Sequence, residues 1–350
     1  MALALSACGG SANGGEDTGE GDVPIVGVGS ATQEAAQESW IEGFERREAG
    51  AKVSYEPTEP GRGRREFLAG DAAYAASDTP LEGAELRQAV ERCRPGQLVE
   101  VPAYLSKIKV GIHVGDVGLI ALTPRTLARI FAGEIDEWSD PEIRRENTTI
   151  AKLLRGPITV VYPAGKSGMT ANVTAFLSEA APGVWRHGSS EAWPVPKGGV
   201  AVARPRAVLA AIEAREGAIG FADASWAATL KPVIFKTGSD VSDTAPPDAG
   251  SSIVVLEGSP EASELKASPY MLPFDLERPV GMRDVYPLVF TSYLIACTRY
   301  ESAGEGASVR GFFEYAVGPK GQEAASHEAG SDPLAGELQQ RSEAAVRAIE

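Results

Sequence analysis

The sequence has no long apolar run, fewer basic than acidic residues, and a low aromatic content of 7%. Its 350 residues include 33 Lys and Arg against 48 Asp and Glu, which gives a net charge of −15. Such an acidic chain lacks the positive surface that a nucleic-acid backbone requires, so general nucleic-acid binding is excluded. No stretch approaches the roughly 18 consecutive apolar residues that cross a bilayer, so any membrane attachment has to be an anchor.

Histidine and cysteine are also scarce. The chain has only His113, His187, His327, Cys8, Cys93 and Cys297. Because these residues form neither a CxxC motif nor a cluster, nothing in the sequence indicates a metal site or another cofactor. Setting Cys8 aside leaves an even pair, Cys93 and Cys297, which an oxidising compartment would join in a disulfide; two buried free thiols are the alternative.

The N-terminus has the form of a bacterial lipoprotein signal. Leu5-Ser6-Ala7-Cys8 matches a lipobox and follows an apolar start. We interpret residues 1–8 as the end of a signal peptide, with Cys8 as the lipid anchor. Residues 9–23 are rich in glycine and acidic residues and are predicted to form a flexible tether. The alternative is a frayed terminus with an incidental cysteine.

The remaining chain alternates between strand and helix patterns. Strands are predicted at residues 24–29, 52–55, 73–76, 108–114, 158–162 and 217–221. A helix with Trp40 and Phe44 on its buried face follows the first strand, and a Gly/Pro/Arg-rich loop at 59–65 precedes a helix from Glu66. This alternation predicts an α/β protein with parallel sheets, and ligands of such sheets bind where the strands end.

Gly165-Lys166-Ser167 follows a predicted strand and could be mistaken for a phosphate-binding loop of nucleotide hydrolases. It is not one, because Val160 occupies the place of the required first glycine. A helix that begins here could still bind an anion through its free amides and the positive end of its dipole. A capped helix that faces water is the alternative.

Together, six motifs resemble one family, the phosphate-binding lipoproteins and periplasmic receptors of the phosphate ABC transporter. In order, they are Gly27-Val28-Gly29-Ser30 followed by Trp40, Tyr74-Ala75-Ala76-Ser77-Asp78-Thr79-Pro80-Leu81, Ile130-Phe131-Ala132-Gly133-Glu134-Ile135 with Trp138-Ser139-Asp140-Pro141, Ser167-Gly168-Met169-Thr170, Gly217-Ala218-Ile219-Gly220-Phe221, and Tyr286-Pro287-Leu288. The resemblance runs from about Ile25 to the C-terminus.

This resemblance implies a two-lobed type II periplasmic-binding-protein fold. Each lobe would hold a mixed or parallel sheet flanked by helices, and a two-strand hinge would join the lobes. Lobe one would comprise residues 24–101 and 286–350, and lobe two residues 102–285. A Cys93–Cys297 bridge would then tie a segment near the hinge to the strand that returns to lobe one.

The family's anion site is kept only in part. Where the family has a threonine and backbone amides in the first loop, this chain has Ala31, flanked by Ser30 and Thr32. Asp78 matches the carboxylate that accepts the proton of hydrogen phosphate, which sulfate lacks at neutral pH. The resemblance therefore implies that proton matching by Asp78 is retained.

The last loop keeps Ser167 and Gly168, and Thr170 follows close by, but Tyr162 or Pro163 stands where the family has an arginine. In the second loop, Pro60-Gly61-Arg62 replaces the family's Gly-Ser-Gly, so a hydroxyl is lost and a guanidinium gained. Lys166 or Arg62 could supply the missing positive charge, and Gly61 lies beside the latter. The alternative is that both are solvated surface charges.

We therefore predict an extracytoplasmic, lipid-anchored, monomeric solute-binding protein of a bacterial cell membrane. It would capture phosphate or a related oxyanion and deliver it to the permease of an ABC transporter. No enzymatic activity is expected, because no nucleophile accompanies a base or metal constellation. The alternative is a degenerate receptor that no longer transports and acts as a cell-surface sensor or scaffold.

Overall fold

The structure is a computed structural model that describes residues 23–195, 198–204, 206–238, 240, 243–247 and 251–350. The predicted lipobox with Cys8, and the predicted tether apart from Val23, lie outside these residues. No helix in the described ranges has the length and apolar character needed to span a membrane.

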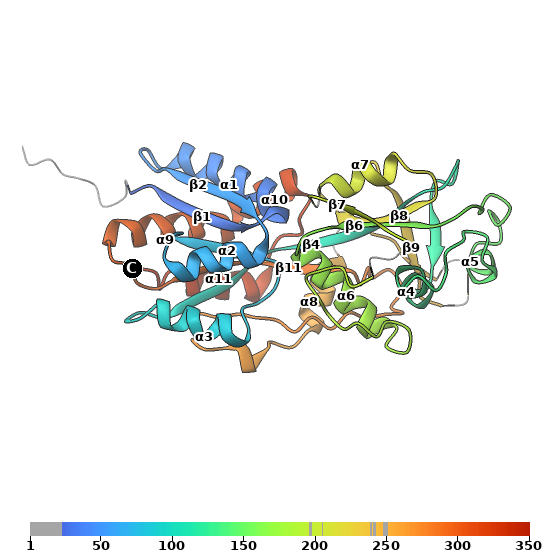
Figure 1. The fold of residues 1–350 in the computed structure, drawn as a ribbon. Coiled ribbons are helices and arrows are strands. Elements are labelled where there is room, and N and C mark those ends of the chain that lie inside the picture. Colours follow the sequence, from blue (N-terminus) through green and yellow to red (C-terminus); the bar gives the residue numbers. More distant parts are fainter. Residues whose placement is uncertain (1–22, 196–197, 205, 239, 241–242, 248–250) are drawn as a thin grey trace, which may run out of the picture.

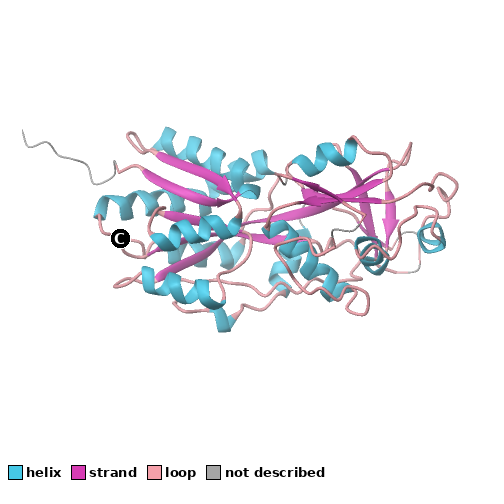
Figure 2. Cartoon of the chain, in the orientation of Figure 1, coloured by secondary structure: helices cyan, strands magenta, loops and turns pink. Residues whose placement is uncertain are grey.

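Two α/β lobes lie side by side, each with a sheet flanked by helices (Figures 1 and 2). The strands follow the order β2-β1-β3-β11-β4-β8-β6-β7. Strand β4 (Leu98–His113) passes through both lobes, because residues 98–107 pair with β11 (Val289–Cys297) and residues 108–113 pair with β8. The segment that enters β11 runs beside β4 between the lobes, since the amide of Ile108 donates to the carbonyl of Leu288 at 2.9 Å, so two chain segments connect the lobes as predicted. The predicted fold class is confirmed.

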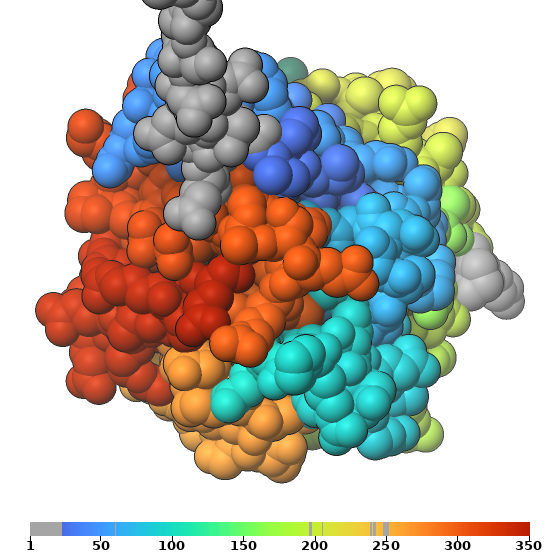
Figure 3. All heavy atoms as spheres, turned by 90° about the vertical axis from the view of Figure 1, so that its left-hand side faces the viewer, coloured from blue at the N-terminus to red at the C-terminus, as the bar shows by residue number. Residues whose placement is uncertain are grey.

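The first lobe is built from both ends of the chain. It contains β1 (Ile25–Ser30), η1 (Ala31–Gln33), α1 (Glu34–Arg47), β2 (Val53–Thr58), α2 (Pro60–Ala69), β3 (Tyr74–Ser77), α3 (Gly83–Arg92), α9 (Ala303–Val317), α10 (Pro319–Ala329) and α11 (Gly336–Val346). Strand β1 runs parallel to β2 and β3, whereas β11 runs antiparallel to β3. Viewed end-on, this lobe shows blue N-terminal and red C-terminal segments on one surface (Figure 3).

Helix α1 packs as its sequence pattern predicts. Trp40 and Phe44 lie in the core, where Phe44 contacts the ring of Phe312 edge-on, and Trp40 Nε1 donates to the carbonyl of Gly321 at 2.8 Å. These contacts join the N-terminal helix to α9 and α10 near the other end of the chain. The lobe is therefore one packing unit despite its two separate chain segments.

The prediction of a loop at residues 59–65 is wrong, because α2 begins at Pro60. Gly63 allows close packing rather than a turn, because a Cβ added there would lie 2.4 Å from the Cα of Gly29. Helix α2 can therefore press directly against the end of β1. The composition of the segment indicated a loop because packing and turn glycines look alike in a sequence.

The second lobe surrounds the other half of the sheet. It contains β5 (Ile120–Leu122), α4 (Pro124–Phe131), α5 (Pro141–Glu146), β6 (Thr159–Pro163), α6 (Gly168–Ala180), β7 (Val200–Val202), α7 (Ala207–Glu213), β8 (Ala218–Asp223), β9 (Lys231–Lys236) and β10 (Thr244–Ala245). The chain continues through α8 (Ser251–Gly258), whose Leu256 packs with Leu105 and Leu334, and η2 (Ser263–Leu265). Large buried side chains such as Trp138, Phe176 and Phe235 form its core. The predicted cap of α4 is present, since Thr123 accepts from the amide of Thr126.

The residue boundaries given above for the lobes stay predictions. The boundary between 101 and 102 falls inside β4. Residues near 271 belong to the range predicted for lobe two, yet Met271 packs in a cluster with Phe67 and Leu98 of the first lobe. The return of the chain toward β11 therefore lies alongside the first lobe before it enters the sheet.

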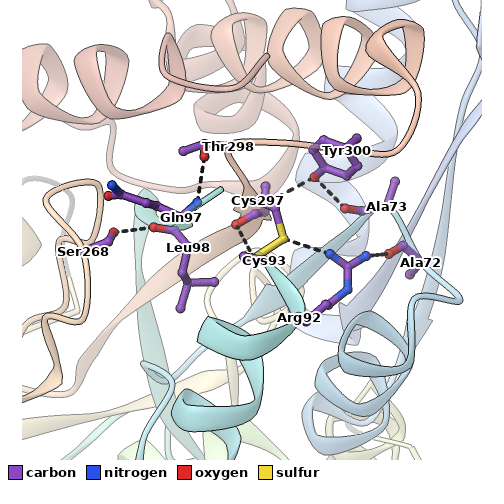
Figure 4. The surroundings of a disulfide bond; sticks show 11 residues. Ala72, Ala73, Arg92, Cys93, Gln97, Leu98, Ser268, Cys297, Thr298 and Tyr300 are labelled. Atoms are coloured by element: carbon purple, nitrogen blue, oxygen red, sulfur yellow. Dashed lines mark hydrogen bonds between the residues drawn. A yellow bond between two sulfur atoms is a disulfide. The ribbon is translucent and has the colours of Figure 1, made fainter. Parts of the chain in front are cut away.

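The disulfide between Cys93 and Cys297 is present, which confirms the predicted pairing over two free thiols (Figure 4). It joins the C-terminus of α3 to the end of β11, with a Cα–Cα distance of 5.1 Å. Arg92 covers it by donating from Nη1 to Cys297 Sγ at 2.9 Å, while its guanidinium lies over the ring of Phe67. The bridge therefore ties the edge of the first lobe to its central strand.

Candidate ligand-binding cleft

Three chain segments meet where strands β1 and β3 of the first-lobe sheet end. Strands β1 and β3 are parallel neighbours, with Gly29 opposite Ala76, so Ser30 and Asp78 emerge close together where these strands end. Strand β11 brings Ser292 to the same place, because Tyr293 pairs with Ser77. The parallel register thus assembles polar side chains from distant parts of the sequence, as the loop positions predict.

Asp78 is fully buried just beyond the end of β3. Thr32 Oγ1 donates to Asp78 Oδ2 at 2.6 Å, Ser30 Oγ donates to the same oxygen, and Ser292 Oγ donates to Oδ1 at 3.2 Å. Burial raises the pKa of Asp78, and the hydroxyl hydrogen bonds offset part of that rise. In the described part of the chain, no Lys, Arg or His forms an ion pair with this carboxylate.

The second lobe contributes the start of helix α6. Ser167 caps this helix by accepting from the amide of Thr170, and the next residue, Gly168, packs against Asp78. A Cβ added at Gly168 would lie 2.6 Å from the Cβ of Asp78. Asn172 Nδ2 then donates to the carbonyl oxygen of Asp78 at 3.0 Å. The two lobes are therefore in direct contact at Asp78.

Beside this contact lies a cavity of about 570 Å³ between the lobes. Its lining contains Ser30, Ala31, Thr32, Glu34, Pro57, Thr58, Glu59, Pro163, Gly165, Lys166, Ser167, Ala203, Arg204, Arg206, Ala207 and Trp226. Five residues singled out from the sequence are among them: Ser30, Ala31, Thr32, Lys166 and Ser167. The cavity therefore joins the β1 end of the first lobe to the α6 start of the second.

The other singled-out residues do not line this cavity. Asp78 reaches it only through Ser30 and Thr32, and Gly168 is covered by Asp78. The hydroxyl of Thr170 is buried and has no partner among the described residues. Gly61 lies in the first turn of α2.

Arg62 forms ion pairs outside the cavity. It pairs with Glu56 at 2.9 Å and with Glu66 at 2.6 Å, and its side chain is 49% exposed. These carboxylates also raise the pKa of Arg62. Lys166 does line the cavity, with its Nζ 3.7 Å from Glu191 Oε2. Of the two cations considered from the sequence, the structure therefore places only Lys166 at the cavity.

Sequence reasoning missed the charged residues on the rest of the wall. Arg206 Nη2 lies 3.1 Å from Glu34 Oε2 across the cleft, and its guanidinium lies over the ring of Trp226 at 4.8 Å. Arg204 and Glu59 are also part of the wall. The only signal available was the pair of arginines just before α7, and charges at the start of a helix usually face solvent.

A second pair of charges bridges the lobes. Arg64 of α2 is buried; its Nη2 donates to Glu191 Oε1 of the second lobe at 2.8 Å, and its Nε donates to Glu85 Oε2 at 2.6 Å. No group of three or more His, Cys, Asp or Glu side chains that could hold a metal ion occurs in the described residues. The cleft is therefore a polar site built from hydroxyls, helix amides and paired charges.

Comparison with known proteins agrees with this architecture. Residues 11–320 match the family described as "PBP superfamily domain". The chain is 30% identical over 366 residues to the Phosphate-binding protein PstS2 of Mycobacterium bovis, covering 99% of this chain and 95% of that protein.

Solved structures share the fold. A high-affinity periplasmic phosphate-binding protein, solved with phosphate bound, superposes with a TM-score of 0.74 at 22% identity, covering 92% of this chain and 93% of the other. A putative phosphate ABC transporter substrate-binding protein from Clostridium perfringens, also with bound phosphate, superposes with a TM-score of 0.61 at 14% identity, covering 89% of this chain and all of the other. The family match and the full-length relatives establish that this chain belongs to the PBP superfamily.

Proposed function

We propose that this protein is an extracytoplasmic solute-binding subunit that captures phosphate between its lobes and delivers it to the permease of an ABC transporter. It binds its ligand without converting it chemically and acts as a monomer. Full-length relatives named phosphate-binding proteins support this function. The observation that carries it is the buried Asp78 carboxylate, held by two hydroxyls that line the cavity between the lobes.

Asp78 selects the ligand through Ser30 and Thr32. A hydroxyl has one proton and two lone pairs, so a hydroxyl that donates to Asp78 presents only lone pairs to the cavity. One of those lone pairs accepts the proton of hydrogen phosphate, whereas sulfate carries no proton at neutral pH. The amides at the start of α6 and the charge of Lys166 stabilise the anionic oxygens.

Calorimetric titration of the chain with phosphate and sulfate at pH 7 tests this function. We expect phosphate to bind and sulfate to give no heat. Asp78→Asn should weaken phosphate binding at least tenfold, because an amide NH₂ donates to a hydroxyl oxygen and so occupies a lone pair that the ligand proton needs. Asp71→Asn, at an exposed position just before β3, is the matched control and should bind like the parent chain. Absence of phosphate binding by the parent chain would contradict the proposal.

One contact favours a second candidate, a receptor that has lost transport and serves as a sensor or scaffold. Gly168 packs directly on Asp78, which leaves no space for a ligand between them. In that case phosphate would give no heat and would leave the radius of gyration in solution scattering unchanged. A transporting receptor would instead bind phosphate and become more compact on binding.

We also propose that the protein is held at the bacterial cell membrane by a lipid on Cys8. The Leu5-Ser6-Ala7-Cys8 sequence supports this location. Cells that express the chain should incorporate labelled palmitate into it, and Cys8→Ser should abolish the label. Equal labelling of both chains would contradict the anchor and leave the binding function untouched.

A further inference from the structure

One arginine in the wall of the cleft is placed to bind the charge of the ligand. We propose that Arg206 is the guanidinium that binds the anion, and that Glu34 competes with the anion for it. The ion pair between Arg206 and Glu34 is then exchanged for a pair between Arg206 and phosphate. This inference rests on the proposed function, because it concerns the same cleft and names the residue that binds the charge of the ligand.

The hydroxyls beside Asp78 cannot compensate the charge of the ligand. Hydrogen phosphate carries two negative charges and one proton, and one of the hydroxyls that donate to Asp78 accepts that proton. The other oxygens of the ion need donors that carry positive charge. Lys166 is one such donor, but its Nζ lies 3.7 Å from Glu191 Oε2, which compensates part of its charge. A second cation is therefore expected in the wall.

Arg206 lines the cavity and is oriented by contacts with both lobes. Its guanidinium lies over the ring of Trp226 in the second lobe, 4.8 Å from the ring centroid, and its Nη2 lies 3.1 Å from Glu34 Oε2 of the first lobe. Glu34 closely follows Thr32 in the chain, and both residues line the cavity. The guanidinium therefore lies at the end of the cavity that holds the hydroxyls.

The contact with Glu34 shows what kind of group this guanidinium binds. Carboxylates and phosphates present oxygen acceptors to the same fork of N–H donors, so an anion can take the place of the carboxylate. The Arg206 side chain is 49% exposed, and an ion pair this exposed contributes little free energy. Stacking on Trp226 keeps the guanidinium in the wall when Glu34 leaves it. A doubly charged anion therefore displaces the carboxylate with little loss.

Arg64, the other arginine between the lobes, has different surroundings. It is buried, and its nitrogens donate to Glu85 and Glu191. Turning Arg64 toward a ligand would leave these acceptors without their charged partner, which is unfavourable for buried groups. The Glu34 side chain is 29% exposed, so water solvates its carboxylate once Arg206 binds the anion. Arg206 can therefore change partners more easily than Arg64.

Calorimetric titration of the full chain with phosphate at pH 7 tests the inference. We expect Arg206→Gln to weaken phosphate binding at least about tenfold, because a charge-assisted contact is lost. Glu34→Gln should tighten phosphate binding about threefold, because the competing carboxylate is gone. The double variant Glu34→Gln/Arg206→Gln should bind at least about tenfold more weakly than Glu34→Gln alone. Both side chains are partly exposed, and thermal unfolding verifies that each variant is folded.

The double variant separates two roles of Arg206. If Arg206 only neutralised Glu34, its loss would have no effect once Glu34 is replaced. Equal phosphate binding by Glu34→Gln and the double variant would therefore overturn the inference and leave the proposed function standing. Absence of phosphate binding by the parent chain would overturn both.

Arg204→Gln and Glu42→Gln are the matched controls. Arg204→Gln removes the same charge from the same wall and keeps the pair of Arg206 with Glu34, so it should weaken phosphate binding less than about threefold. Glu42→Gln removes an exposed carboxylate from α1 outside the cavity and should bind like the parent chain. Equal losses in Arg204→Gln and Arg206→Gln would show a general effect of positive charge and would overturn the assignment to Arg206.

Discussion

Arg64 of the first lobe donates from Nη2 to Oε1 of Glu191 in the second lobe at 2.8 Å. The arginine side chain is only 7% exposed, and its other nitrogens donate to Glu85 and Ser77 within its own lobe. The bond to Glu191 therefore connects a guanidinium already fixed in one lobe to a carboxylate of the other. Such a contact costs little ordering entropy, because one partner is held in place before the lobes meet.

Glu191→Gln should shift the protein toward separated lobes. The substitution keeps the shape but removes the charge that Arg64 and Lys166 face, and a hydrogen bond to a charged group contributes about 1.5–3 kcal/mol. We expect a larger radius of gyration in solution scattering and roughly tenfold weaker ligand binding. Glu38→Gln, at an exposed position on α1, is the control. An unchanged radius of gyration would show that this bond does not hold the lobes together.

Gly168→Ala should destabilise the contact between the lobes at Asp78. The added methyl group would lie 2.6 Å from the Cβ of Asp78, so the start of α6 has to move away from the first lobe. Overpacking of this kind costs about 1–3 kcal/mol of the free energy of unfolding, measured by urea denaturation. Gly183→Ala adds the same group in open space and should change the free energy by less than about 0.5 kcal/mol. Equal effects in the two variants would refute a tight contact at Gly168.

The site shows which features a sequence can predict. Asp78 could be located because it follows a short apolar strand and lies in a recognisable motif, and Trp40 and Phe44 could be placed in the core because they are four residues apart on one helix. The role of Gly63 could not be predicted, because only its contact with Gly29 distinguishes a packing glycine from a turn glycine.

The charged residues that line the cavity could not be predicted for a different reason. Arg206 lies near Glu34 only because α7 and α1 belong to facing lobes, and that arrangement depends on how the lobes meet. Arg62 shows the converse error, since its position beside the site motif suggested a ligand contact although two glutamates hold it outside the cavity. Long charged side chains can point in several directions, so their sequence position predicts their partners poorly.

Reduction of the Cys93–Cys297 disulfide should lower stability without changing the fold. The bridge closes a loop with a sequence separation of 204 residues, and removal of a native disulfide costs about 2–5 kcal/mol. We expect a loss in this range in the free energy of unfolding when dithiothreitol is added. The double variant Cys93→Ala/Cys297→Ala should show the same lower stability and no response to the reductant. A response in the double variant would point to another target of the reductant.

Glu100 should make stability fall as the pH rises from 6 to 8. This β4 residue is fully buried: its Oε1 accepts from the amide of Leu81 at 2.7 Å, while Oε2 has no partner among the described residues. Burial raises the pKa of Glu100 from its ordinary value of 4.5 to about 8. Between these values the folded chain keeps the proton and the unfolded chain releases it, so rising pH favours unfolding by about 1.4 kcal/mol per pH unit.

Urea denaturation of the parent chain and Glu100→Gln between pH 6 and 8 isolates this effect. Burial raises the pKa of Asp223 to about 6, so this group also titrates near the lower limit, but it does so in both chains and cancels from their difference. The glutamine keeps an oxygen for the Leu81 amide and cannot ionise, so its stability should decline less steeply with pH, and the gap between the two chains should widen toward pH 8. Glu82→Gln, an exposed neighbour, should retain the parent slope. Parallel pH profiles for the parent chain and Glu100→Gln would mean that Glu100 is ionised in the folded protein throughout this range.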